Sequence, residues 1–69
     1  MNIQLIPIPP DTVASLKEDA LRVAEEIGVD AHFEGTAFGG SVRLNLASDD
    51  TTKAFIKAMK RICQVVIVP

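Results

Sequence analysis

The sequence predicts a two-layer α+β domain whose elements follow in the order strand, helix, strand, strand, helix, strand. Apolar residues recur at helical spacing over residues 12–27 and 51–63. Apolar and polar residues alternate over residues 29–34 and 42–46, on either side of a glycine-bearing link, as in a β-hairpin. Runs of aliphatic residues, many of them β-branched, open and close the chain. We therefore expect a four-stranded sheet with two helices packed on it.

The first strand and the first helix are marked by their ends. Residues 2–8 are extended and apolar, and the prolines that follow Ile6 donate no ladder hydrogen bonds, so the strand should end near Ile6. Asp11 or Thr12 can cap a helix over residues 12–27, and Gly28 is a typical helix terminator. The residues on the apolar stripe of this helix are Val13, Leu16, Ala20, Val23 and Ile27.

The second half predicts a hairpin, a helix and a final strand. In the hairpin, Asp30, His32 and Glu34 share the polar face of the first strand, and residues 35–40 form the link. Asp49 and its neighbours can cap the second helix. Four apolar residues form the buried face of that helix, with Cys63 at its end: Phe55, Ala58, Met59 and Ile62. The last strand covers Val65–Val68.

Composition narrows the class of protein. A chain of 69 residues fits one small domain, residues 1–69, and 48% hydrophobic residues favour a packed core. The formal charge of -2 gives no general attraction to nucleic acid or to anionic membranes. One cysteine cannot form an internal disulfide, and we expect neither a signal peptide nor a membrane span, since the first residues lack the pattern of a signal peptide and no apolar run approaches about 18 residues. We expect a soluble cytoplasmic protein that binds neither nucleic acid nor membrane.

Three features of the sequence contain residue types that chemical sites use. His32 beside Asp30 and Glu34, with Arg43 and Asn45 across the hairpin, has the groups for acid–base chemistry or metal binding. A solvated polar sheet face explains the same pattern, and we favour that reading. The glycine-rich link lacks the lysine of a phosphate-binding loop, and it joins two strands. Cys63 fits a buried structural thiol. We therefore expect no enzyme, no cofactor and no metal site.

Charge and aromatic residues suggest contacts instead. Four of the 7 basic residues lie on the second helix: Lys53, Lys57, Lys60 and Arg61. These residues form a solvated helix face, complement the acidic first helix, or bind an anionic partner. Phe38 in the link either folds onto the core, the reading we favour, or anchors a partner.

The final strand is the strongest candidate for a binding surface. It is apolar on both alternating faces, whereas the two hairpin strands are apolar on one. An exposed apolar strand at a sheet edge invites pairing. We expect a protein partner or a second copy of the chain to bind there. The predicted partner-binding residues are Ile6, His32, Phe38, Arg43, Val66 and Val68.

The size and order of elements resemble the ferredoxin-like superfold. That resemblance implies the strand order fourth, first, third, second, with both helices on one face of an antiparallel sheet. Heavy-metal-associated domains of this fold carry Cys-x-x-Cys after the first strand, and residues 6–11 here hold no cysteine. RNA-recognition motifs need stacking aromatics on the first and third strands, where this chain has Ile3, Leu5, Arg43 and Asn45. The arginine of the acylphosphatase first loop is also absent.

Function is expected on this basis to be non-enzymatic. The first hypothesis is a protein-interaction module, a regulator or inhibitor that self-associates and acts through the open sheet face and the C-terminal strand edge. ACT-like domains share the element order, so a regulatory domain with a small ligand at a dimer interface is the first alternative. A second alternative, which the small size of the chain allows, is a small phage-encoded inhibitor of a host protein complex. A minimal enzyme built on His32 ranks last, because a closed pocket is hard to build in so short a chain.

Overall fold

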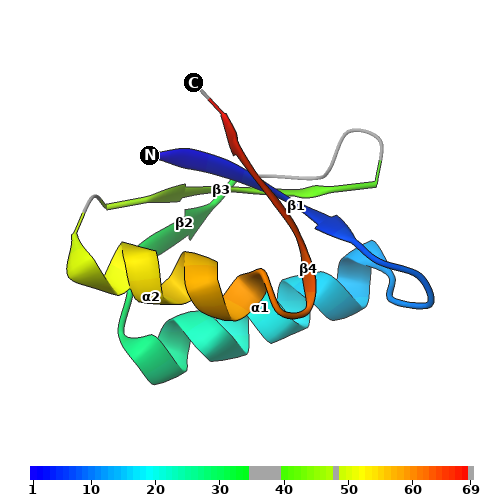
Figure 1. Ribbon diagram of the computed structural model, residues 1–69, viewed down its shortest axis with the longest axis horizontal. Helices are drawn as coiled ribbons and strands as arrows, with labels where there is room; N and C mark the ends of the chain where they lie inside the picture. The colour runs from blue at the N-terminus through cyan, green and yellow to red at the C-terminus, as the bar shows by residue number, and fades with distance from the viewer. Residues whose placement is uncertain (35–39, 48, 69) are drawn as a thin grey trace.

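The computed structural model, which describes residues 1–34, 40–47 and 49–68, confirms the predicted order of elements. Four strands form one antiparallel sheet in the order β2-β3-β1-β4. Both helices lie on the same side of this sheet (Figure 1). The fold is the expected ferredoxin-like α+β sandwich. Its elements are β1 (Asn2–Pro7), α1 (Val13–Ile27), β2 (Ala31–Phe33), β3 (Val42–Leu46), α2 (Asp50–Met59) and β4 (Cys63–Val68).

Both ends of helix α1 follow from local sequence. Thr12 is the N-cap, and its side-chain oxygen accepts a hydrogen bond of 3.2 Å from the backbone amide of Ser15. Gly28 takes the left-handed conformation with φ of 79°. The backbone amides of Gly28 and Val29 both donate to the carbonyl of Ala24, at 2.9 and 3.1 Å. These two hydrogen bonds to one carbonyl oxygen end the helix, and the chain then continues toward β2.

The core lies between the helices and one face of the sheet. Leu16 of α1 and Phe55 and Met59 of α2 are fully buried against the sheet. Each such side chain contributes roughly 1.5–3 kcal/mol through the burial of its apolar surface. The sheet supplies Ile3, Leu5, Val42, Leu44, Leu46 and Cys63. Burial on alternate residues of β1 and β3 leaves the opposite face of the sheet outside the core.

The boundary between α2 and β4 was predicted wrongly. Helix α2 ends at Met59, and β4 already begins at Cys63. Cys63 pairs with Pro7, because β4 pairs with β1 as far as the last residue of β1. Cys63, the last residue of the expected helix, is therefore the first residue of the strand. Ile62, which was expected to be buried, lies in the connecting turn and is 36% exposed. Tertiary pairing overrides the helical spacing of the sequence here.

Strand β2 is shorter than the alternation predicts. It covers only Ala31–Phe33, and Val29 is buried in the segment before it. The pairing with β3 sets His32 opposite Asn45, as expected for the polar face of the hairpin. The sheet therefore has a short edge at β2 and a longer edge of six residues at β4.

Candidate functional site

The open face of the sheet is the side that carries no helix. Strand register places His32, Asn45, Asn2 and Val68 in one row across all four strands. Arg43, Gln4 and Val66 form the next row across β3, β1 and β4. We call this surface the open face. It is polar over β2 and β3 and becomes apolar over β4.

Side-chain hydrogen bonds order the polar part of the open face. The amide of Asn45 donates to the side-chain oxygen of Asn2 at 2.6 Å, across β3 and β1. The amide of Gln4 on β1 donates to the hydroxyl of Ser41, the residue before β3, at 2.7 Å. These amides thus fasten β1 to β3 on the solvent side of the sheet.

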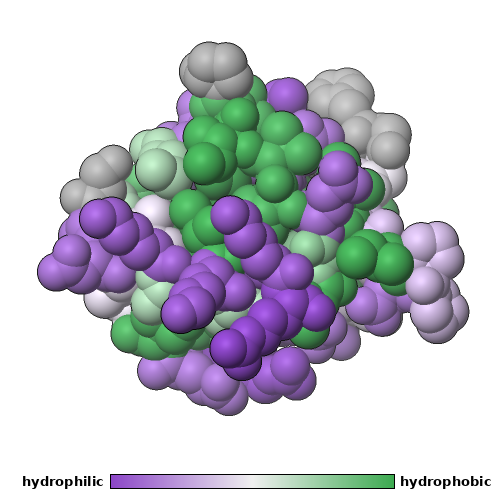
Figure 2. Space-filling model, in the orientation of Figure 1, coloured by the Kyte–Doolittle hydropathy of each residue, from purple (hydrophilic) through white to green (hydrophobic). Residues whose placement is uncertain are grey.

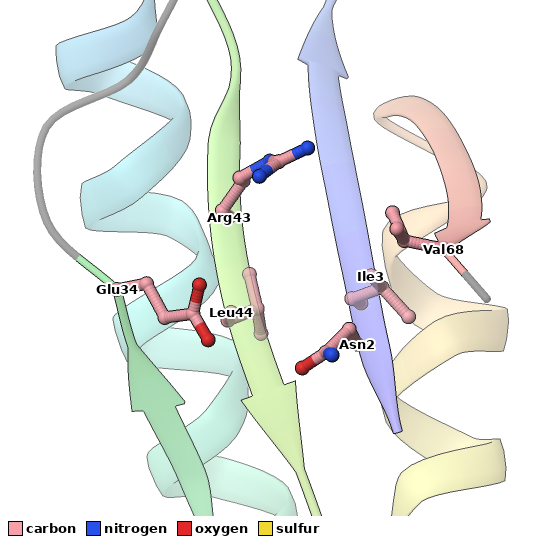
Figure 3. A pocket seen from close by; sticks show the side chains of 6 residues that line it. All are labelled: Asn2, Ile3, Glu34, Arg43, Leu44 and Val68. Atoms are coloured by element: carbon pink, nitrogen blue, oxygen red, sulfur yellow. The ribbon is translucent and has the colours of Figure 1, made fainter.

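A shallow hollow lies between Arg43 and Val68. It measures about 50 Å³ and is lined by Asn2, Ile3, Glu34, Arg43, Leu44 and Val68. Arg43 reaches from β3 toward β1, and the Glu34 carboxylate points from the end of β2 toward β3 (Figure 3). The volume of this hollow is enough for one or two water molecules, whereas sites for small ligands measure about 300–1,000 Å³. The hollow alone does not enclose a metabolite.

The apolar part of the site is β4 itself. Val66 on the open face is 37% exposed, and Ile67 on the helix side is 58% exposed. Figure 2 shows hydrophobic side chains gathered over the region where β4 crosses in front of the sheet in Figure 1, above a row of hydrophilic side chains over α2. We call the outer side of β4, with Val65–Val68, the β4 edge. An exposed apolar strand at a sheet edge is a surface suited to binding.

The structure brings some of the predicted residues together and separates others. Val66 and Val68 share the open face of β4, and Ile6 lies on the same face of the neighbouring strand β1. Arg43 shares the small hollow with Val68. His32 lies on β2, at the far edge of the sheet, with Asn45 between it and the strands of the apolar part. Phe38 lies outside the described residues.

Ile67 was missed as a surface residue. Alternation places it on the helix side, opposite Ile3, where the sequence suggests burial. Ile3 is buried and Ile67 is not, because β4 is the outermost strand and its end lacks a neighbour on one side. The only signal in the sequence was the apolar character of the last strand on both of its faces.

Two features of the described residues bear on chemistry: metal binding and the reactivity of the Cys63 thiol. Within the described ranges, no group of three or more histidine, cysteine or acidic side chains is placed to hold a metal ion. The Cys63 thiol is buried, and burial raises its pKa, with the Asp11 carboxylate adding a smaller effect in the same direction. A buried thiol with a raised pKa is a poor nucleophile. None of the helices described is long and apolar enough to cross a membrane.

The chain has no significant match among models of known protein families, among curated proteins or among solved structures.

Proposed function

We propose that this chain is a non-enzymatic protein-interaction module that binds a protein partner through the β4 edge and the adjoining open face. The observation that carries the proposal is the exposure of Val66 and Ile67 on the outermost strand. Among the described strands, β4 pairs only with β1, so about half of its backbone amides and carbonyls point away from the sheet. A partner strand added there gains both backbone hydrogen bonds and apolar contact.

The composition of β4 supports binding because it lacks the usual protection of an edge. Exposed edges are commonly blocked by a charged side chain, a proline or a short strand. Between Cys63 and Val68 there is no charged residue and no proline, and β4 has six residues. A regulator or inhibitor that acts by occupying a surface of another protein would present such an edge.

The test replaces the apolar side chains of the edge. In the β4 variant, Val66→Lys and Val68→Lys are combined, since lysines on an edge strand oppose pairing. The control is Ile8→Lys, which places a lysine at another exposed apolar residue, in the connection before helix α1. All three proteins are compared by light scattering on a sizing column across a dilution series. Each also serves as bait for quantitative capture from an extract.

Two results decide the proposal. Self-association or captured proteins shared by the wild type and Ile8→Lys, and lost from the β4 variant, support binding at this edge. An unchanged mass together with an unchanged set of captured proteins in the β4 variant would reject it. Circular dichroism of the variants shows whether any loss comes from unfolding.

A second candidate is a regulatory domain that binds a small ligand between two copies. The hollow beside Arg43 favours it, because its lining includes a basic side chain, Arg43, an acidic one, Glu34, and apolar Val68. A second copy would have to close the hollow, given its size. A thermal-shift screen of amino acids and nucleotides tests this function: a ligand present at about 100 times its Kd should add about 2.7 kcal/mol. No shift across the screen counts against it.

A further inference from the structure

The β4 edge is bordered by positive charge on its helix side. Helix α2 packs against β4 and runs into it through a short turn. Lys53, Lys57 and Lys60 recur at spacings of four and three residues, so they lie along one flank of α2, and all are exposed. The hydrophilic row below the apolar patch in Figure 2 covers this helix. We call these three lysines the basic flank.

The start of α2 carries the carboxylates of Asp49 and Asp50, but the basic flank itself remains positively charged. Lys53 lines a hollow of about 280 Å³ together with Met1, Asp49, Asp50, Thr52 and Ile56. The Asp49 carboxylate is occupied as the helix cap, where it accepts hydrogen bonds from the backbone amides of Thr51 and Thr52. Further along the helix the flank holds lysine only.

The opposite edge of the sheet carries the complementary charge. An open hollow of about 410 Å³ lies between α1 and β2. Leu21, which is 46% exposed, lines it together with the carboxylate-bearing residues Glu25 and Asp30. Lys17 and Glu18 both lie one turn back from Leu21 on α1, so the negative charge of this edge comes from Glu25 and Asp30. The complete lining is Leu21, Ala24, Glu25, Gly28, Val29, Asp30, Ala31 and Phe33, with no basic residue among them.

The two edges are matched in direction as well as in charge. Strand β1 is antiparallel to both β3 and β4, and β2 is antiparallel to β3, so β2 and β4 run in opposite directions. A second copy set beside the first without inversion therefore continues the antiparallel sheet, with β4 of one copy next to β2 of the other. Its helices stay on the same side of the sheet.

We propose that a second copy of this chain occupies the β4 edge by means of its own β2 edge, so that copies join head to tail. Figure 3 shows α2 behind β4, and α1 behind β2 and β3. In the joined pair, the basic flank of one copy lies beside Glu25 and Asp30 of the next. Exposed Ile67, on the helix side of β4, meets exposed Leu21 in the hollow beside β2. This inference rests on the proposed function, because it names the partner of the same edge.

Charge favours this arrangement over a two-fold dimer. Pairing β4 with β4 of another copy would bring two α2 helices together, and the basic flanks would face each other. Like charges set against each other across an interface oppose binding. A standard interface takes about 800 Å² from each partner, which is less than a fifth of the chain's 4471 Å² of accessible surface.

The test uses two variants that each lose one half of the interface. The β4 variant is Val66→Lys with Val68→Lys, which keeps the β2 edge. The β2 variant is Leu21→Lys with Glu25→Lys, which keeps the β4 edge. The changed side chains are exposed or half-buried in the chain, and circular dichroism confirms folding. Sedimentation velocity measures the mass of the wild type, of each variant and of a one-to-one mixture, up to about 0.5 mM, where weak complexes form.

Head-to-tail joining predicts a specific pattern. The wild-type mass rises with concentration, because each added copy leaves one free edge of each kind. Each variant alone stays monomeric, and the mixture forms a dimer and nothing larger, because one intact β4 edge meets one intact β2 edge. Raising the salt concentration weakens the association, since charges at its rim are screened.

Three outcomes overturn the proposal. A wild type that is monomeric at the highest concentration has no second copy as partner. A β2 variant that associates like the wild type shows pairing that does not use β2. A mixture that remains two monomers shows that the halves are not complementary. In each case the proposed function is decided separately, by whether capture of partners by the chain is lost in the β4 variant.

Discussion

The thiol of Cys63 donates a hydrogen bond of 3.2 Å to the backbone carbonyl of Met59. The bond joins the first residue of β4 to the last residue of α2. Cys63 is only 3% exposed, and it sits where the chain turns from the helix into the edge strand. The position of the candidate binding strand relative to the basic flank is therefore fixed by a buried junction.

Burial of this junction predicts slow thiol chemistry. We expect iodoacetamide at pH 8 to alkylate Cys63 at least about tenfold more slowly in the folded chain than in denaturant, because access and thiolate formation are both reduced. The control is Ala54→Cys combined with Cys63→Ser, which places the thiol on an exposed helix position. Mass spectrometry follows both reactions. Equal rates for Cys63 in the folded and unfolded chain would contradict the burial of the junction.

The raised pKa of Cys63 also predicts how stability changes with pH. The folded chain holds the thiol proton more tightly than the unfolded chain, so its contribution is fully present below the unfolded pKa of 9.0. Above that value the unfolded chain loses the proton first, and stability falls as pH rises. Urea unfolding at several pH values between neutrality and this alkaline range measures the slope. Cys63→Ser should remove this part of the slope, and an unchanged slope would count against the assignment.

The cap of α2 predicts a loss of stability at one carboxylate. Hydrogen bonds from the Thr51 side chain and the Thr52 amide lower the pKa of Asp49. We expect Asp49→Ala to lower the unfolding temperature by several degrees, and Asp50→Ala, in the first turn, to lower it less. The Asp49 contribution is present above the unfolded pKa, near 4, and disappears as pH falls through the folded pKa. Thermal melts of both variants at neutral and acidic pH check the difference, and equal losses for the two aspartates would contradict it.

The end of α1 predicts a backbone effect at Gly28. Its φ of 79° is unfavourable for residues with a side chain, although no atom lies within 4 Å of an added Cβ. We expect Gly28→Ala to cost about 1 kcal/mol of unfolding free energy from conformation alone, with a smaller cost for Gly28→Asn. Urea denaturation of the two variants measures both values. A neutral Gly28→Ala would mean that the helix can end in another way.

Periodicity was sufficient to predict the order and the faces of the elements, and it failed where neighbours decide. The alternation that placed His32 and Asn45 on the polar face of their strands and the stripe that buried Leu16 are local properties of the chain. The strand order came from resemblance to a fold, since spacing alone does not choose partners. Helical spacing carried α2 too far because the length of β1 determines where β4 begins. The exposure of Ile67 likewise depends on its place at the sheet edge, which no local pattern encodes.

Association through the β4 edge predicts that stability depends on protein concentration. Self-association that occurs only in the folded state stabilises it by mass action, so the wild-type unfolding temperature should rise as the chain is concentrated. The β4 variant should match the wild type within about 0.5 kcal/mol at low concentration, because Val66 and Val68 lie outside the core. Its unfolding temperature should then stay constant with concentration. Scanning calorimetry over a wide dilution range compares the two proteins, with Ile8→Lys as the control that retains the dependence. A wild-type unfolding temperature that is independent of concentration would mean that no second copy stabilises the fold. The β4 edge would then be a binding site for a different protein.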